Sequence, residues 1–368
     1  MCLSYRIRKG EYSMKRLLAI FMIFVVLFSS FAFAEDLTLI GNTTKNKVKM
    51  KKSYADNPVI EGVSSTTGLP ASGEAYTPIM VVLDNSEAAH PHWGVSQADI
   101  IFQVPNAGEG ATKLLALFAD HYPEQAGGVR SARASMVPVV KSWDAAFAFA
   151  GGPELKNSNV DPSKLMSKVG MWKAKKVYNL MSGWAHRVDF VKRPHNSSCH
   201  VLEIHENLLK DGVSFEQRPF LFTDEPRTEG ATAEYIEIIH RGDNKKTRSN
   251  PASEASYTYD AELGAYIRSN SSGTYVDRDT QEAIPFANVI VLRVKFKWAS
   301  KYLYLNDHLK GSGVAEIFQN GKYVRGAWMR KSSDDRIVFI GPDGKELPMQ
   351  RGKTFIVVTN DVTEVSYR

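Results

Sequence analysis

The sequence predicts a mixed α/β domain over residues 75–231, followed by a smaller all-β domain over residues 232–368. Three observations support this prediction. Continuous apolar runs of strand length alternate with helix-like segments in the first part, which is typical of layered α/β domains. Short apolar runs separated by turn residues fill the second part. The composition, 43% hydrophobic and 23% charged over 368 residues, is that of a globular protein with room for two domains.

The first 34 residues have the pattern of an export signal. Met14, Lys15 and Arg16 form a basic start, Leu17 to Phe28 form an apolar core, and Ala32-Phe33-Ala34 resembles a cleavage site. The apolar core is shorter than the roughly 20 residues that a membrane-spanning helix needs. We therefore expect an exported protein outside the cytoplasmic membrane, held to that membrane only if the signal stays uncleaved. Translation starts at either Met1 or Met14.

Residues 35–74 are rich in Lys, Asn, Ser and Thr, and the basic tract Lys45–Lys52 lies within them. This composition predicts a flexible tether. Of the formal net charge of +6, the signal segment contributes four, so the rest of the chain is nearly neutral. Such a charge gives no reason to expect nucleic-acid binding. Cys199 is the one cysteine outside the signal segment, which excludes an internal disulfide.

The elements of the first domain follow in chain order. Strands are expected at Ile79–Leu83, Asp99–Val104, Leu114–Phe118 and Ala145–Ala150, and helices at Ser135–Trp143, Asp161–Lys168 and Val201–Lys210. In the second domain we expect short strands from Tyr235 onward, with hairpin or turn signals at Asn320-Gly321 and Pro342-Asp343-Gly344.

A glycine-rich bend suggests a binding site for an anion. Gly127 and Gly128 precede Arg130, Ser131 and Arg133 at the expected start of a helix. Guanidinium groups offer a flat fork of donors suited to carboxylate or phosphate. Alternatively, both arginines pair with carboxylates of the protein itself and stabilise the fold.

Other polar residues lie where a cleft could form. Asp84 and Asn85 follow a buried strand, Glu109 lies between glycines, and His195 and Asn196 follow a proline. A carboxylate, a histidine and a guanidinium can support acid–base hydrolysis. The same residues can instead form a buried network that fixes the order of the strands, and the sequence leaves both interpretations open.

Signatures of cofactor and metal sites are absent from the sequence. It contains no His-Glu-x-x-His motif, no phosphate loop and no dinucleotide fingerprint. His200 and His205 are five residues apart and so do not share a helix face. We therefore expect no cofactor and no metal. A nucleophilic serine in Gly-x-Ser-x-Gly is also missing.

Seven motifs stand out along the chain: Pro78–Asn85, Gly94–Ile100, Val129–Arg133, Ala150–Gly152, Arg193–Asn196, Phe286–Val291 and Gly326–Trp328. Together they resemble the YerB-like family of exported bacterial proteins, whose domain is known as domain of unknown function 3048. The resemblance covers roughly residues 75–360. It implies an exported, often lipid-anchored protein with a mixed α/β part and a β part, and at least one member is linked to regulating peptidoglycan synthases. No reaction is established for the family.

This chain departs from the family pattern in three places. It lacks the cysteine that would accept a lipid, and Glu109 alone remains of an acidic segment. Lys113 stands where family members tend to have arginine, which replaces a planar fork by a point charge. The resemblance places Lys113 in the candidate site.

Three functional hypotheses follow. The first is a non-catalytic envelope protein that binds an anionic cell-wall component or a peptidoglycan synthase through a cleft containing Arg130 and Arg133. The second is a cell-wall hydrolase or transferase that uses Asp84, Glu109 and His195. The third is a structural scaffold whose arginines are internal.

Overall fold

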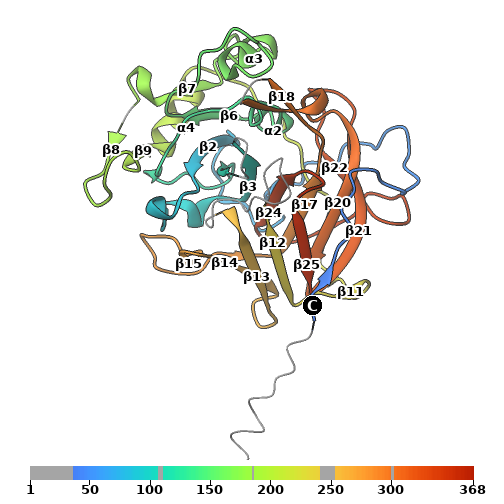
Figure 1. The fold of residues 1–368 in the computed structure, drawn as a ribbon. Helices are drawn as coiled ribbons and strands as arrows, with labels where there is room; N and C mark the ends of the chain where they lie inside the picture. Colours follow the sequence, from blue (N-terminus) through green and yellow to red (C-terminus); the bar gives the residue numbers. More distant parts are fainter. Residues whose placement is uncertain (1–35, 107–110, 185, 241–252, 300–301) are drawn as a thin grey trace, which may run out of the picture. The chain divides into compact units, whose positions relative to one another are not determined.

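The computed structural model describes residues 36–106, 111–184, 186–240, 253–299 and 302–368. Within this part of the chain, the largest element is an eleven-stranded mixed sheet, in which the path β11-β21-β20-β17-β24-β3-β4-β2-β6-β7 is extended by β22 beside β21 (Figure 1). Its strands are Ile79–Asp84 (β2), Ile100–Pro105 (β3), Thr112–Phe118 (β4), Ala146–Phe149 (β6), Val177–Asn179 (β7), Ala231–Thr232 (β11), Asn288–Arg293 (β17), Gly311–Gln319 (β20), Lys322–Arg330 (β21), Val338–Ile340 (β22) and Thr354–Thr359 (β24).

This sheet combines strands from both parts of the chain. Strand β24 runs parallel to β3 on one side and to β17 on the other, so the sheet crosses the domain boundary that we expected near residue 231. Residues 38–368 form one compact unit. Because the hydrogen-bonded ladder continues from β3 through β24 to β17, strands from the two expected domains satisfy each other's backbone hydrogen bonds.

The described part of the chain is mostly β-structure with few helices, so the expected split into an α/β first domain and an all-β second domain is not confirmed. Only six residues separate β3 from β4, too few for a helical crossover, so these strands pair antiparallel. The helices are short: Val137–Ser142 (α2), Pro162–Lys168 (α3) and Val201–Lys210 (α4). Single turns of 3-10 helix lie at Glu87–Ala89 (η1), Val95–Gln97 (η2), Leu180–Ser182 (η3) and Asn306–Leu309 (η5).

A second, seven-stranded sheet runs in the order β1-β25-β12-β13-β14-β15, with β16 beside β14, counted over the described residues. Its strands are Thr38–Leu39 (β1), Tyr235–Ile239 (β12), Ala255–Asp260 (β13), Ala265–Asn270 (β14), Gly273–Thr274 (β15), Pro285–Phe286 (β16) and Glu364–Tyr367 (β25). Three small sheets pair β10 (Phe222–Thr223) with β23 (Met349–Gln350), β18 (Phe296–Ala299) with β19 (Tyr302–Leu305), and β9 (Ser197–Cys199) with both β5 (Ala126–Gly127) and β8 (His186–Arg187).

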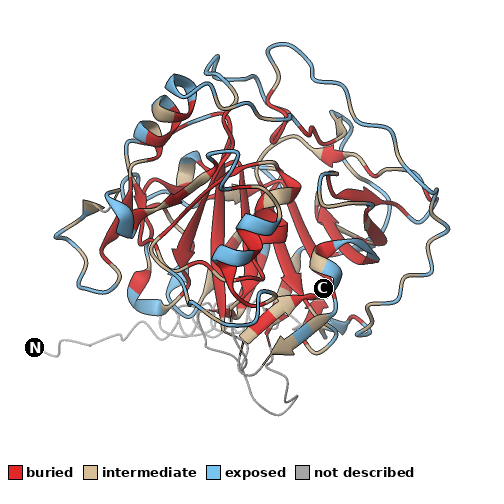
Figure 2. Cartoon of the chain, turned by 90° about the horizontal axis from the view of Figure 1, so that it is seen from above, coloured by how far each residue is buried: buried red, intermediate tan, exposed pale blue. Residues whose placement is uncertain are grey.

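The large sheet is buried on both faces, as its continuous apolar runs predict. Met80 and Val82 of β2 pack in one core with residues of α2 and α3. The alternate residues Val81 and Leu83 pack in a second core with α4 and the seven-stranded sheet. Figure 2 shows the resulting interior, with buried strands enclosed by exposed helices and loops. No helix of the described residues has both the length and the apolar character needed to cross a membrane.

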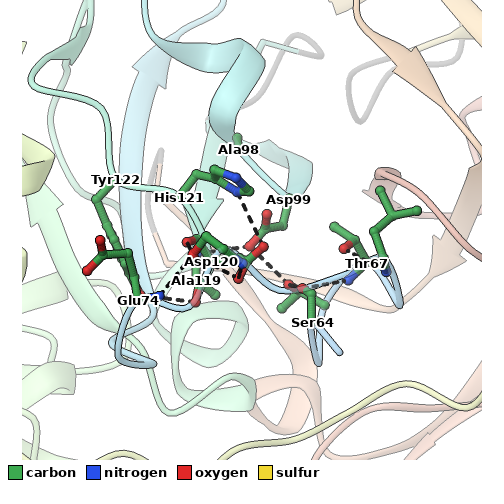
Figure 3. A network of polar contacts seen from close by, with 12 residues as sticks. Ser64, Thr67, Glu74, Ala98, Asp99, Ala119, Asp120, His121 and Tyr122 are labelled. Carbon is green, nitrogen blue, oxygen red and sulfur yellow. Dashed lines mark hydrogen bonds and ion pairs between the residues drawn. The ribbon is translucent and has the colours of Figure 1, made fainter. Parts of the chain in front are cut away.

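The C-terminal part of the expected flexible tether, residues 35–74, contacts the large sheet. Thr66, fully buried, donates a hydrogen bond of 2.9 Å to Asp99 at the start of β3. Ser72 donates its backbone N–H to Asp120 at 3.0 Å, and the Tyr122 hydroxyl accepts the backbone N–H of Thr77 at 2.9 Å. Figure 3 shows Asp99, Asp120 and Tyr122, which take part in these contacts, from close by. The polar residues that suggested a solvated tether are here used as hydrogen-bonding partners.

Asp99 makes the stability of this network depend on pH. Burial raises the pKa of its carboxyl to about 6 from an ordinary value of 3.8, although Lys353, Thr66 and the N–H of Ala119 oppose the shift. The folded state therefore holds a proton that the unfolded state has lost between these values, so this contribution to stability disappears as the pH rises from about 4 to 6.

We expect Asp99→Asn to remove that dependence. The free energy of unfolding of the variant, relative to the wild type, should increase by about 3 kcal/mol between pH 4 and pH 7. Urea denaturation at several pH values measures this difference. Asp361→Asn, an exposed control, should give a curve parallel to the wild type. A parallel curve for Asp99→Asn would show that the carboxyl titrates alike in both states.

Candidate functional site

Asp84 is the last residue of β2, at the carboxyl end of a strand buried on both sides. Its partner across the antiparallel ladder is Lys113 of β4. Because side chains alternate along a strand, Asp84 follows Met80 and Val82 on the face that packs against α2 and α3. The strand register thus places a carboxylate opposite an ammonium group on the same face of the sheet.

Three cationic or basic side chains surround the Asp84 carboxylate. Its Oδ2 atom lies 2.9 Å from Nε of Arg130 and 2.8 Å from Nδ1 of His195. Its Oδ1 atom lies 3.7 Å from Nζ of Lys113. The Asp84 side chain is only 8% exposed, so this cluster is shielded from water on the carboxylate side.

The charges in the cluster shift one another's protonation. Burial alone would raise the pKa of Asp84, but Lys113, Arg130 and the hydrogen bond from His195 outweigh burial and hold it below its ordinary value. Burial lowers the pKa of Lys113 to about 8; Asp84 opposes this shift, while Arg130 and Arg133 add to it. At neutral pH Asp84 is therefore ionised and acts as the shared counter-ion of the cluster.

The glycine-rich bend positions Arg130 between the ends of two strands. The N–H of Arg130 donates to Val82 of β2 at 3.0 Å, and its carbonyl oxygen accepts from Ala150, just after β6, at 2.9 Å. Gly128 packs so closely that a Cβ atom there would lie under 3.0 Å from the His195 carbonyl oxygen. A glycine is needed because the backbone of the bend and the loop carrying His195 touch directly.

A cavity of about 180 Å³ adjoins Arg130. Its lining consists of Val129, Arg130, Ala150, Met181, Arg187, Arg193, Pro194 and Ser197. Arg130 is one-third exposed and pairs with Asp84, whereas Arg187 donates to the neutral amide oxygen of Asn196 at 2.8 Å. Arg193 has no hydrogen-bond or ion-pair partner among the described residues. Three guanidinium groups thus line one small cavity and pair with a single carboxylate within the described chain.

The structure separates the remaining residues of the predicted site. Arg133 donates to its neighbouring carbonyl at Ala132 at 2.8 Å, pairs with no carboxylate of the described residues, and does not line the cavity. Burial lowers the pKa of its guanidinium, and Arg130 adds to this effect. Ser131 is partly exposed and its hydroxyl makes no hydrogen bond within the described chain.

Asn85 and Asn196 hold neighbouring parts in place. Asn85 points to the opposite face of the sheet, where it donates to Thr112 at 2.9 Å and lies 3.2 Å from Nε2 of His90. Asn196 is buried beneath Arg187 and donates to the Val188 carbonyl at 3.0 Å. Glu109 lies outside the described residues.

Arg187 and Arg193 were not expected in the site from the sequence. Arg193 belongs to the Arg193–Asn196 motif, of which we expected only His195 and Asn196 in the site. Arg187 reaches the cavity because β8 pairs with β9, which places it opposite Ser197. Strands of two or three residues are too short to show a recognisable pattern in the sequence.

The pair of Asp84 and His195 is also arranged in a way that suits proton transfer. A carboxylate that binds Nδ1 of an imidazole fixes its orientation and leaves Nε2 to exchange a proton. Nε2 of His195 has no partner among the described residues. Cys199, in contrast, is fully buried, and burial raises the pKa of its thiol, which disfavours the nucleophilic thiolate.

Together, the fold and site define a class of β-rich proteins with a large mixed sheet and an arginine-lined cavity at the ends of its strands. Residues 66–214 match the family described as "Protein of unknown function (DUF3048) N-terminal domain", and residues 246–356 match its C-terminal domain. The chain belongs to this YerB-like family, which confirms the resemblance inferred from its motifs.

Relatives of known sequence and structure agree with this assignment. The "Putative lipoprotein YerB" of Bacillus subtilis (strain 168) is 28% identical over 291 residues, covering 78% of this chain and 83% of the relative. The crystal structure of the YerB protein from Bacillus subtilis has a TM-score of 0.67 and 25% identity, covering 82% of this chain and 99% of that one.

Proposed function

We propose that this protein is an exported component of the cell envelope that binds an anionic cell-wall component at the cavity of Arg130, Arg187 and Arg193. The envelope location is supported by similarity to a protein described as a lipoprotein. Binding without catalysis remains our first hypothesis, because the described site lacks an activated nucleophile. A peptidoglycan synthase that offers a carboxylate to the same cavity is the alternative occupant.

The observation that carries this proposal is the excess of guanidinium groups over carboxylates around the cavity. Arg187 and Arg193 are exposed, and neither pairs with a carboxylate of the described residues. A planar guanidinium recognises carboxylate or phosphate oxygens in pairs, and each charge-assisted hydrogen bond is strong. A volume of about 180 Å³ holds such a group with a short part of the molecule that carries it.

The proposal predicts that Arg187→Ala and Arg193→Ala weaken binding of soluble peptidoglycan fragments. Each loss should lower the affinity about tenfold or more, as expected for a hydrogen bond to a charged group. Isothermal titration with the full exported chain measures this effect, with inorganic phosphate as a second probe. Arg325→Ala on β21 is the matched control, since Arg325 lies outside this cavity and should leave the affinity unchanged.

The outcomes of this titration separate the hypotheses. Unchanged affinity in both variants would exclude the cavity as the binding site. If fragments fail to bind while a purified peptidoglycan synthase binds the wild type but not Arg193→Ala, the partner is the occupant. If neither binds, the scaffold hypothesis is favoured.

A cell-wall hydrolase or transferase is the second candidate function, because Asp84 and His195 form an oriented pair. Chromatography of peptidoglycan incubated with the protein detects product release. Release that survives Arg187→Ala but is lost in His195→Ala would favour catalysis over binding alone. If wild-type protein binds the fragments but releases no products, the hydrolase or transferase function is excluded.

A further inference from the structure

A second cluster of chemically active side chains lies outside the arginine-lined cavity. The cluster consists of His186 in β8, His200 just before α4, and Glu203 in the first turn of α4. Each residue places one potential ligand atom within 4.8 Å of the others. Nε2 of His186 lies 3.5 Å from Oε2 of Glu203, and Nδ1 of His200 lies 3.8 Å from the same oxygen. The three residues come from two elements that a short sheet brings together.

Local geometry explains why the cluster forms. His200 is the N-cap residue of α4, and Glu203 follows three positions later, so both side chains lie on the same side of the first helical turn. His186 pairs with Ser198 across the β8–β9 ladder, and His200 lies two residues beyond Ser198. The side chain of His186 therefore meets the start of α4.

Strand alternation separates this cluster from the arginine-lined cavity. Successive side chains of a strand point to opposite faces. His186 faces Glu203, whereas its neighbour Arg187, paired with Ser197, lines the cavity. The cluster is thus a distinct site on the other face of the same two-stranded ladder.

Two imidazoles and one carboxylate are a ligand set that Zn²⁺ uses in proteins, with a water molecule in the fourth position. Ligand atoms of a tetrahedral zinc at about 2.0–2.2 Å are separated from one another by about 3.4 Å. The two distances to Glu203, 3.5 Å and 3.8 Å, are close to that separation. The imidazole rings stack with centroids 3.5 Å apart and planes 12° from parallel, so at least one ring must rotate out of the stack to direct both lone pairs at one ion. Their exposed fractions, 42% and 36%, leave room for this rotation.

We propose that His186, His200 and Glu203 form a Zn²⁺ site. The ion joins β8 to the start of α4 and so closes the loop of residues 188–196, which carries Arg193 and His195. This site departs from our sequence-based expectation of no metal. That expectation compared His200 with His205, whereas the structure pairs His200 with a histidine from another element. The proposal is independent of anion binding at the cavity.

Isothermal titration of the full exported chain with zinc chloride tests the site directly, using chelator-treated protein without a polyhistidine tag. We expect one equivalent of Zn²⁺ to bind, and a rise in melting temperature that a chelator reverses. His186→Ala, His200→Ala and Glu203→Gln should each weaken binding at least about tenfold, since even outer partners of metal ligands have effects of this size. All three side chains are partly or fully exposed, so these variants should fold normally.

His121→Ala is the matched control. His121 is an exposed histidine 3.3 Å from the carboxylate of Asp120, but no third ligand completes a cluster around it among the described residues. Its removal should leave zinc binding unchanged. The proposal is overturned if wild-type protein binds no zinc, or if the His186→Ala, His200→Ala double variant binds it with unaltered affinity.

Cobalt substitution provides a readout of geometry. Co²⁺ bound to the wild type should give the strong visible absorption of a tetrahedral site, and His186→Ala should lose that absorption. A weak spectrum typical of six-coordinate Co²⁺ in the wild type would contradict the zinc-type geometry.

Discussion

Asp84→Ala is expected to destabilise the fold by about 3 kcal/mol, because it removes the shared counter-ion of a largely buried cluster. The Lys113 side chain is 7% exposed and loses its ion-pair partner. Arg130 is one-third exposed and regains some hydration, which keeps the loss at the lower end of the range for broken buried pairs. Urea denaturation at pH 7 measures the change.

The stability of Asp84→Ala should also depend on pH differently from that of the wild type. The pKa of Lys113 is about 8 in the presence of Asp84 and should fall further without it, so the ammonium group can lose its proton. The unfolded state then holds more protons than the folded state, so the stability of Asp84→Ala relative to the wild type should rise with pH up to about 8. Above that pH, Lys113 has lost its proton in both folded proteins and the two curves should run parallel.

Two controls accompany Asp84→Ala. Asp84→Asn keeps the shape and an acceptor oxygen for Arg130, and it should lose less stability than the alanine variant. Asp361→Ala removes an exposed carboxylate and should change the free energy of unfolding by under about 0.5 kcal/mol. Equal stability of Asp84→Ala and wild type would mean that the cluster does not need its carboxylate.

Glu316→Ala is expected to cost about 3–5 kcal/mol, since it leaves the guanidinium of Arg293 buried without a counter-charge. Both side chains are 0% exposed, and Nε of Arg293 lies 2.9 Å from Oε1 of Glu316. Arg293 also donates to the carbonyl oxygens of Asn360 and Thr363, at 2.8 Å and 3.0 Å. The pair therefore anchors the chain between β24 and β25 to the large sheet.

A double variant separates the loss of the pair from the cost of an unpaired charge. Arg293→Met with Glu316→Leu removes both charges, and it should be less destabilised than Glu316→Ala. Burial raises the pKa of Glu316, although Arg293 opposes the shift, so the ionised carboxylate is itself held at a cost. Glu262→Ala, at an exposed turn, is the control. A double variant as unstable as Glu316→Ala would contradict this account.

The strands of the large sheet were the most predictable part of the fold. The runs Ile79–Leu83, Asp99–Val104 and Leu114–Phe118 were expected as strands and form β2, β3 and β4 within a residue or two. These runs are apolar on both faces, which few alternatives to a buried strand satisfy. Their partners were not predictable, because pairing between β24 and β3 joins residues more than 200 positions apart.

The candidate site was predictable in its residue types but not in its full membership. Asp84, Arg130 and His195 carry visible signals: a strand end, a glycine-rich bend and a Pro-His motif. Arg187 and the His186–His200–Glu203 cluster depend on a two-residue strand, β8, whose position follows from contacts with β9 rather than from its own pattern.

By itself, the sequence determined which segments are buried strands and which polar residues stand at their ends, because apolar periodicity and turn chemistry act over a few neighbouring residues. Tertiary structure alone decided that one sheet unites both halves of the chain, that Asp84 serves three basic groups, and that Arg187 and His186 face opposite sides. Those outcomes depend on long-range strand register, where each pairing is selected by the packing of the whole core rather than by local preference.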